Sequence, residues 1–160
     1  MLRSPDLTTV ALFDHFEFED ADEKSRVQRM LIRARKYLTS FDWSGRIVAE
    51  YVGLAVGDVI AVFLFKIDSA VRDVDEWIWV VDGDVPSAYL GATSDLRTPA
   101  QALDGYIGAA EEWINAVRAG RPVATLIPLR LPPDSANADA LQERLRFFDR
   151  EILPPYQHDL

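Results

Sequence analysis

Apolar residues recur every three to four positions near the N-terminus, which is the period of an α-helix. The stripe consists of Val27, Met30, Leu31, Ala34, Leu38 and Phe41. A helix with this spacing has one apolar side that packs against a core. Asp20 and Glu23 precede the stripe with the spacing of a capping box, in which two side chains bond free backbone N–H groups at a helix start. The pattern therefore predicts a helix that begins just after Asp20.

Between residues 46 and 68 the pattern changes to one that is rich in β-branched and aromatic side chains, which favours strands. Gly57 and Asp58 indicate a turn between two strands, and Gly53 indicates a bulge or a bend in the first of them. The run IAVFLF over residues 60–65 is apolar without alternation. We expect its strand to be buried on both faces.

A third strand is predicted around Trp77–Val81, where both faces carry large apolar side chains. The connection over residues 69–75 is too short for a helical crossover, so the strand should pair antiparallel with the one before it. Trp77 and Trp79 should point to one face of the sheet. Ile78 and Val80 should point to the other face. Both faces are interpreted as core, with a binding pocket or an oligomer interface on one of them as the alternative. Residues 87–90 should pair back as a short strand.

The C-terminal half reads as two helices. Thr98 and Gln101 form a second capping box with a proline at the first helical position, and Gly120 is a typical C-terminal stop. Residues 123–131 are expected as an edge strand or a loop, because prolines lie within and beside them. Asp134 or Ser135 should cap the last helix, which runs to about Leu153.

These elements predict one α+β domain over residues 1–160. It consists of an N-terminal helix, a mainly antiparallel sheet of about four strands, and two C-terminal helices packed on the sheet. Residues 1–19 are expected as an extended arm or an edge strand, with a short helix over residues 7–16 as the alternative. Residues 154–160 are expected as a polar tail.

The amino-acid composition excludes several kinds of site and partner. The 160 residues include no cysteine and two histidines, and the net charge is −9. The lack of cysteine excludes disulfides and thiolate metal sites, and it fits a reducing compartment. No secretory signal or membrane-spanning run occurs, so a soluble cytoplasmic protein is expected. The negative charge disfavours nucleic acid and anionic membranes as partners.

Carboxylates are the only abundant chemical resource, and no known nucleophile, phosphate-binding or zinc-protease motif occurs. We therefore expect no catalytic residue and no cofactor, and predict a non-enzymatic protein-binding domain. Its sharpest form is an immunity or inhibitor protein that caps a basic partner, where charge complementarity raises association rate and specificity. The candidate binding residues are Asp14, Glu17, Glu19, Asp73, Asp75 and Glu76.

Two alternatives stay open. Asp82 and Asp84 flank a glycine at a strand end, a spacing that can hold Mg²⁺ in a metal-dependent, carboxylate-based enzyme. The same residues are also common in turns whose aspartates bond backbone amides. The second alternative is a homo-oligomeric structural protein, for example a homodimer, that uses the edge of the tryptophan-rich strand.

Residues 83–90 read GDVPSAYL, and a helix containing Trp113 follows. This Gly-Asp-x-Pro-x-x-Tyr-Leu turn with a tryptophan-containing helix resembles small uncharacterised bacterial proteins that share a domain of unknown function. The resemblance covers the middle and C-terminal two-thirds of the chain. It implies a shared structural signature and carries no catalytic residue.

Overall fold

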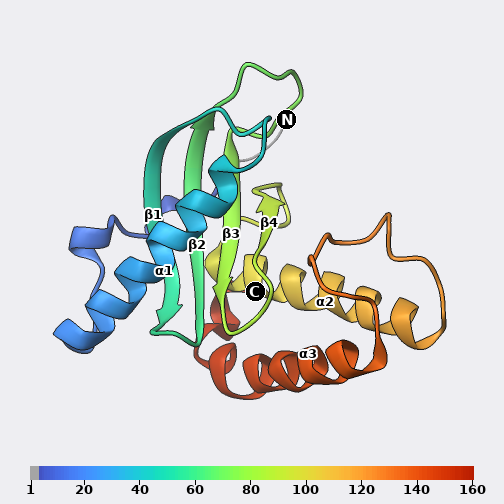
Figure 1. Cartoon of the computed structure of the whole chain (residues 1–160). Helices are drawn as coiled ribbons and strands as arrows, with labels where there is room; N and C mark the ends of the chain where they lie inside the picture. Colours follow the sequence, from blue (N-terminus) through green and yellow to red (C-terminus); the bar gives the residue numbers. More distant parts are fainter. Residues whose placement is uncertain (1–3) are drawn as a thin grey trace.

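The structure is a computed structural model, and it describes residues 4–160. Three α-helices and four strands follow one another along the chain: α1 (Ala21–Thr39), β1 (Arg46–Val56), β2 (Ile60–Asp68), β3 (Trp77–Gly83), β4 (Ala88–Gly91), α2 (Pro99–Arg118) and α3 (Ser135–Phe147). The strands form an antiparallel sheet in the order β1-β2-β3-β4 (Figure 1). The predicted α+β class, with one helix before the sheet and two after it, is confirmed.

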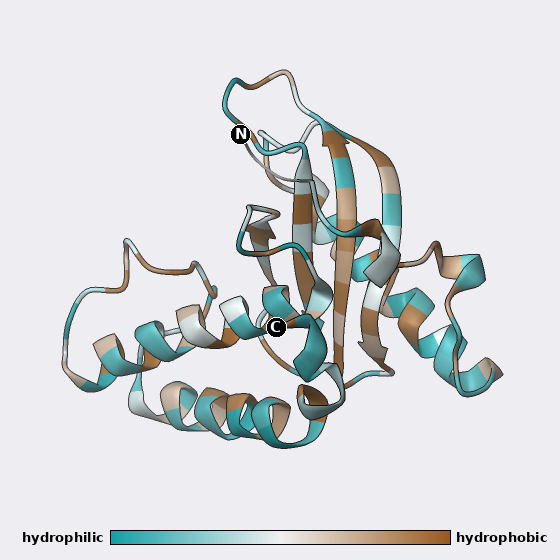
Figure 2. Ribbon diagram, turned by 180° about the vertical axis from the view of Figure 1, so that it is seen from behind, coloured by the Kyte–Doolittle hydropathy of each residue, from teal (hydrophilic) through white to brown (hydrophobic). Residues whose placement is uncertain are grey.

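Helix α1 packs on one face of the sheet and α2 on the other, and α3 packs against α2 (Figure 1). Side chains of β2 alternate between these two faces. Val62 and Leu64 join the core beneath α2, whereas Phe63 and Phe65 join the core beneath α1, and all four are 0% exposed. The strand is apolar along nearly its whole length (Figure 2). Burial of β2 on both faces is thus confirmed.

Gly53 lies at a register shift between β1 and β2, as the sequence predicted. A Cβ atom at this position would lie 2.5 Å from Cγ of Pro99, so the glycine lets the first turn of α2 approach β1 closely. That turn carries the predicted capping box. The hydroxyl of Thr98 accepts from the backbone N–H of Gln101 at 3.1 Å, and the Gln101 side chain accepts from the N–H of Thr98 at 3.2 Å.

The start of α1 matches half of its predicted capping box. Asp20 accepts from the N–H of Glu23 at 2.8 Å, but the Glu23 carboxylate accepts from the N–H of Glu19 rather than from that of Asp20. The buried stripe of α1 is the predicted one up to Leu38.

The N-terminal arm differs from the expected edge strand. It contains two short 3₁₀ turns, Leu7–Thr9 and Phe13–His15, and a single bridge to β1 in which Ala11 and Val52 exchange hydrogen bonds of 2.9 and 2.7 Å. Residues 16–19 form no strand. Their aromatic side chains pack on one another and on α1 instead, with ring centroids about 5 Å apart.

Two C-terminal segments are also defined. Residues 121–134 form a loop, the second of the two predicted alternatives, and Arg130 of this loop lies over the rings of Tyr37 and Phe41 of the α1 end at 5.3 and 5.2 Å. After α3 the chain makes a π turn, Phe148–Ile152, and a 3₁₀ turn, Pro154–Asp159. The expected polar tail is therefore structured, because the carbonyl of Asp159 accepts from the Thr98 hydroxyl at 2.7 Å. Among the described residues, no helix has both the length and the apolar character needed to cross a membrane.

Candidate functional site

Asp82, one of the two aspartates of the metal hypothesis, lies at the end of β3 and is 4% exposed. Its Oδ2 accepts from Nη2 and Nε of Arg33 in α1 at 2.9 and 3.3 Å, and its Oδ1 accepts from the hydroxyl of Ser87 at 3.1 Å. The guanidinium neutralises the carboxylate, and both oxygens have protein donors. Asp82 thus fastens α1 to the β3–β4 turn.

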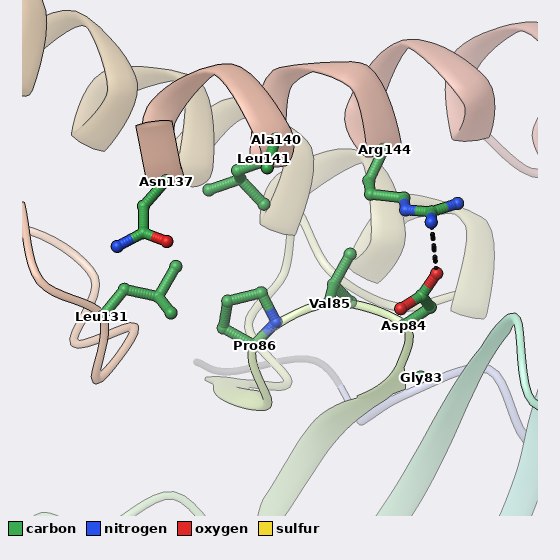
Figure 3. Close-up of a pocket in the computed structure, with 9 residues that line it drawn as sticks. All are labelled: Gly83, Asp84, Val85, Pro86, Leu131, Asn137, Ala140, Leu141 and Arg144. Atoms are coloured by element: carbon green, nitrogen blue, oxygen red, sulfur yellow. Dashed lines mark ion pairs between the residues drawn. The ribbon is translucent and has the colours of Figure 1, made fainter. Parts of the chain in front are cut away.

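Asp84 reaches the opposite layer. Gly83 between the two aspartates has a φ of 152°, which turns the chain, and Asp84 pairs with Nη2 of Arg144 in α3 at 2.7 Å (Figure 3). This ion pair borders an open cavity of about 480 Å³, whose apolar lining includes Pro86 and Leu141. The two aspartates therefore do not face a common position. Within residues 4–160, no three His, Cys, Asp or Glu side chains are arranged to hold a metal ion.

The acids of the β2–β3 connection form one of the two predicted binding groups. Asp73 is exposed in a left-handed turn with a φ of 63°. The carboxylate of Asp75 lies directly over the backbone of Gly91, and Glu76 pairs with Lys66 at 3.2 Å. Of these three acids, Glu76 is thus paired within its own chain.

The second predicted group, Asp14, Glu17 and Glu19, lies elsewhere. In an antiparallel meander the β1–β2 turn and the β2–β3 connection are at opposite ends of the sheet. The start of α1 lies beside the β1–β2 turn, because Arg26 bonds Asp58 of that turn at 3.1 Å. Figure 1 shows the β2–β3 connection at the far end of β2 from this turn. The six predicted acids therefore form two separate groups.

Asp14 of the arm group lines a groove of about 450 Å³ between the arm and α1. We call it the arm–α1 groove; it is lined by Leu12, Phe13, Asp14, His15, Gln28, Leu31, Ile32, Arg35 and Glu50. Glu17 follows Asp14 along the arm, and Glu19 borders a separate hollow at the start of α1. Leu12 and Ile32 are 46% and 50% exposed, which gives the groove two accessible apolar side chains on opposite walls. Exposed apolar side chains that line a groove with a polar rim are typical of an interaction site.

Two residues that line the groove, Arg35 of α1 and Glu50 of β1, form an ion pair. Arg35 donates from Nη2 and Nε to the two carboxylate oxygens of Glu50 at 2.5 and 3.0 Å. The hydrogen bond to Glu50 raises the pKa of the Arg35 guanidinium above its usual value, and the two-point contact fixes the orientation of both side chains. Both groups are therefore satisfied, and the net charge at the groove comes from the arm.

The arm itself is strongly acidic. Residues 4–23 contain seven Asp and Glu side chains and no Lys or Arg. Among the described residues, the nearby cations Lys24 and Arg26 are engaged by the Phe13 ring and by Asp22 and Asp58 respectively. Within residues 4–160, none of the arm group forms an ion pair.

The apolar part of the groove was missed by the sequence reasoning. The only local signal for it is Ile32. This isoleucine follows the buried Leu31 but does not belong to the buried stripe of α1, so it is an apolar residue on the polar side of that helix. Leu12 carries no signal of its own, because its exposure depends on how the arm crosses β1.

Comparisons with known proteins returned no match among protein-family models, curated proteins or solved structures. The resemblance drawn from the Gly-Asp-x-Pro-x-x-Tyr-Leu turn stays a prediction.

Proposed function

We propose that the protein is a non-enzymatic protein-binding domain that docks a basic partner on the arm–α1 groove, as an immunity or inhibitor protein does. The observation that carries the proposal is the combination of an accessible apolar groove, which Asp14 lines, with the further carboxylates that follow along the arm. The partner fitting this surface has one or two apolar anchor residues surrounded by Lys or Arg.

The two parts of the surface have different roles. Burying the exposed parts of Leu12 and Ile32 supplies affinity, since apolar area removed from water contributes about 25 cal/mol per Å². The carboxylates at the rim supply steering and selectivity, because charges at an interface rim mainly change the association rate. Binding should therefore weaken as salt is added.

The β2–β3 acids do not belong to this surface. They lie at the other end of the sheet, and Glu76 already has a lysine partner. This separation supplies a control that carries the same charge change at a different place.

The test is recovery of the tagged protein from its native cell at low salt, followed by quantitative mass spectrometry. We expect one basic protein at near-equal amount, released by salt. Glu17→Lys with Glu19→Lys should weaken its binding by at least about tenfold. Asp73→Lys with Glu76→Lys changes the net charge equally and should leave binding intact.

A test substitution and a matched control substitution probe the apolar part of the groove. Leu12→Asp places a charge in the groove and should abolish binding, whereas Leu7→Asp alters an arm leucine of nearly equal exposure, 45% against 46%, outside the groove. Equal retention by Leu12→Asp and Leu7→Asp, or loss with the β2–β3 variant alone, would contradict the proposal. Recovery of no partner would contradict it as well. We further propose that the protein acts in the cytoplasm, which its lack of cysteine supports.

A further inference from the structure

An open cavity lies between the β3–β4 turn and α3. Its volume of about 480 Å³ falls within the range of about 300–1,000 Å³ that is usual for small-molecule sites. We call it the turn–α3 cavity; it is lined by residues 83–86 of the turn, by Leu131, and by four residues of α3. The arm–α1 groove is lined by other residues, so the two sites can be tested separately.

One wall of the turn–α3 cavity is a single face of α3. Asn137, Ala140, Leu141 and Arg144 follow one another at i, i+3, i+4 and i+7, which places them side by side along two turns of the helix. The small side chain of Ala140 leaves room in the middle of this wall. Figure 3 shows Asn137 at one end of the cavity and the ion pair of Arg144 with Asp84 at the other, with apolar side chains between them. The cavity is thus polar at both ends and apolar in the middle.

The opposite wall is held in place by bonds to the rest of the fold. The carbonyl of Pro86 accepts from the Tyr106 hydroxyl at 2.8 Å, and the N–H of Asp84 donates to the carbonyl of Val59 at 3.0 Å. On the α3 side, Leu141 is 3% exposed and belongs to the core. Both walls are therefore formed without a ligand, which is usual for a small-molecule site.

The ion pair of the cavity leaves charged groups available to a ligand. Arg33 and Arg35 each donate from two nitrogens to one carboxylate, whereas the contact of Arg144 with Asp84 joins one nitrogen, Nη2, to one oxygen at 2.7 Å. A simple acid would bring a second negative charge beside Asp84, and a simple amine would bring a second positive charge beside Arg144. Like charges repel, so a ligand that carries both charges on one small head group suits this pair best.

We propose that the turn–α3 cavity binds a free α-amino acid with a large apolar side chain. The carboxylate of the ligand accepts from Nε and Nη1 of Arg144, and its ammonium group donates to the second oxygen of Asp84. Its side chain lies against Val85, Pro86 and Leu141. The charge-assisted hydrogen bonds orient the head group, and burial of the apolar side chain supplies affinity.

The cavity begins where the tryptophan-rich strand ends, and the strand itself offers no edge to a partner. Strand β3, which carries Trp77 and Trp79, is hydrogen-bonded to β2 on one side and to β4 on the other. Trp79 is fully buried, and its indole N–H donates to the carbonyl of Leu96 at 2.7 Å. The expectation of a homo-oligomer that uses the edge of this strand was therefore wrong.

The first test is isothermal titration calorimetry of the full chain with phenylalanine. We expect a dissociation constant of about 1 mM or tighter. Phenylalaninamide lacks the carboxylate, N-acetylphenylalanine lacks the ammonium group and glycine lacks the side chain, so each should bind at least about tenfold more weakly. No saturable binding of phenylalanine up to about 20 mM, or equally tight binding of any of the three controls, would overturn the proposal.

The second test locates the binding in this cavity with two pairs of variants. Arg144→Gln should weaken phenylalanine binding by at least about tenfold, whereas Arg146→Gln makes the same charge change on α3 outside the cavity and should alter binding less than about twofold. Ala140→Leu fills the middle of the α3 wall and should also weaken binding, whereas Ala136→Leu, one turn earlier and outside the cavity, should not. All four positions are exposed, so the variants should fold, which circular dichroism checks. Equal effects within either pair would contradict this cavity as the site.

Discussion

The ion pair between Arg33 and Asp82 should contribute more to stability than an exposed pair of the same length, because one partner is buried. The two side chains are 54% and 6% exposed. Two unit charges about 4 Å apart attract by about 4 kcal/mol at an effective dielectric constant of 20. Water around the exposed guanidinium screens part of this, and fully exposed pairs contribute only about 0–1 kcal/mol. We therefore expect a coupling energy of about 1–2 kcal/mol.

The measurement is a double-mutant cycle with Asp82→Asn and Arg33→Met, followed by urea unfolding monitored through tryptophan fluorescence and circular dichroism. Asp82→Ala should cost more, about 2–3 kcal/mol, because it also removes the hydrogen bond from Ser87 and leaves a small void.

The control is the pair between Arg118 and Asp139. Its nitrogen–oxygen distance is 2.8 Å, close to the 2.9 Å of the first pair, but its side chains are 39% and 66% exposed. We expect a coupling below about 0.5 kcal/mol there. Equal coupling energies for the two pairs would refute the reasoning that burial of Asp82 makes the difference.

Two glycines and two tyrosines supply further predictions. Gly83→Ala should lower the free energy of unfolding by at least about 2 kcal/mol, because at a φ of 152° the added Cβ would overlap the backbone carbonyl of Val59. Gly120→Ala is the control: its φ is 68°, but the added Cβ would meet no neighbouring atom, so it should cost only about 1 kcal/mol. Both values can be measured by thermal or urea unfolding. Burial raises the pKa of Tyr37 to about 12, and the Tyr37 hydroxyl has no hydrogen-bond partner within the described chain. In the unfolded chain the Tyr37 hydroxyl loses its proton near pH 10, whereas in the folded protein it does so near pH 12. The free energy of folding that depends on the neutral hydroxyl is therefore complete below about pH 10 and is lost as the pH rises through about 12. Tyr37→Phe should be neutral at pH 7 and should reduce this alkaline loss in a pH series of urea unfolding, whereas Tyr106→Phe should cost about 1 kcal/mol, because the Tyr106 hydroxyl donates to the Pro86 carbonyl at 2.8 Å.

The elements that could be predicted are those whose signals lie within one segment. The stripe of α1, the cap of α2 and the continuous apolar run of β2 each depend on neighbours a few residues apart. The N-terminal arm shows the opposite case. Phe16 and Phe18 alternate with Glu17 and Glu19 as in a strand, but a strand also needs a partner, and these aromatic rings pack on α1 instead.

The candidate site was predictable only in part, because it depends on distant segments. Asp82 and Asp84 look like a pair in the sequence, yet the turn at Gly83 directs them to arginines 49 and 60 positions away in different helices. The acids of the arm and of the β2–β3 connection look equivalent in composition. The direction of β2 decides that they lie at opposite ends of the sheet.

The most direct test of the proposed binding surface is a nuclear magnetic resonance titration of the labelled protein with a synthetic peptide of Leu and Lys, against a Leu and Glu peptide as control. We predict salt-sensitive shifts of Leu12, Ile32 and Arg35 with the basic peptide and none with the acidic one. Shifts confined to Asp73, Asp75 and Glu76, or no shifts with either peptide, would contradict the arm–α1 groove as the site where this protein binds a basic partner.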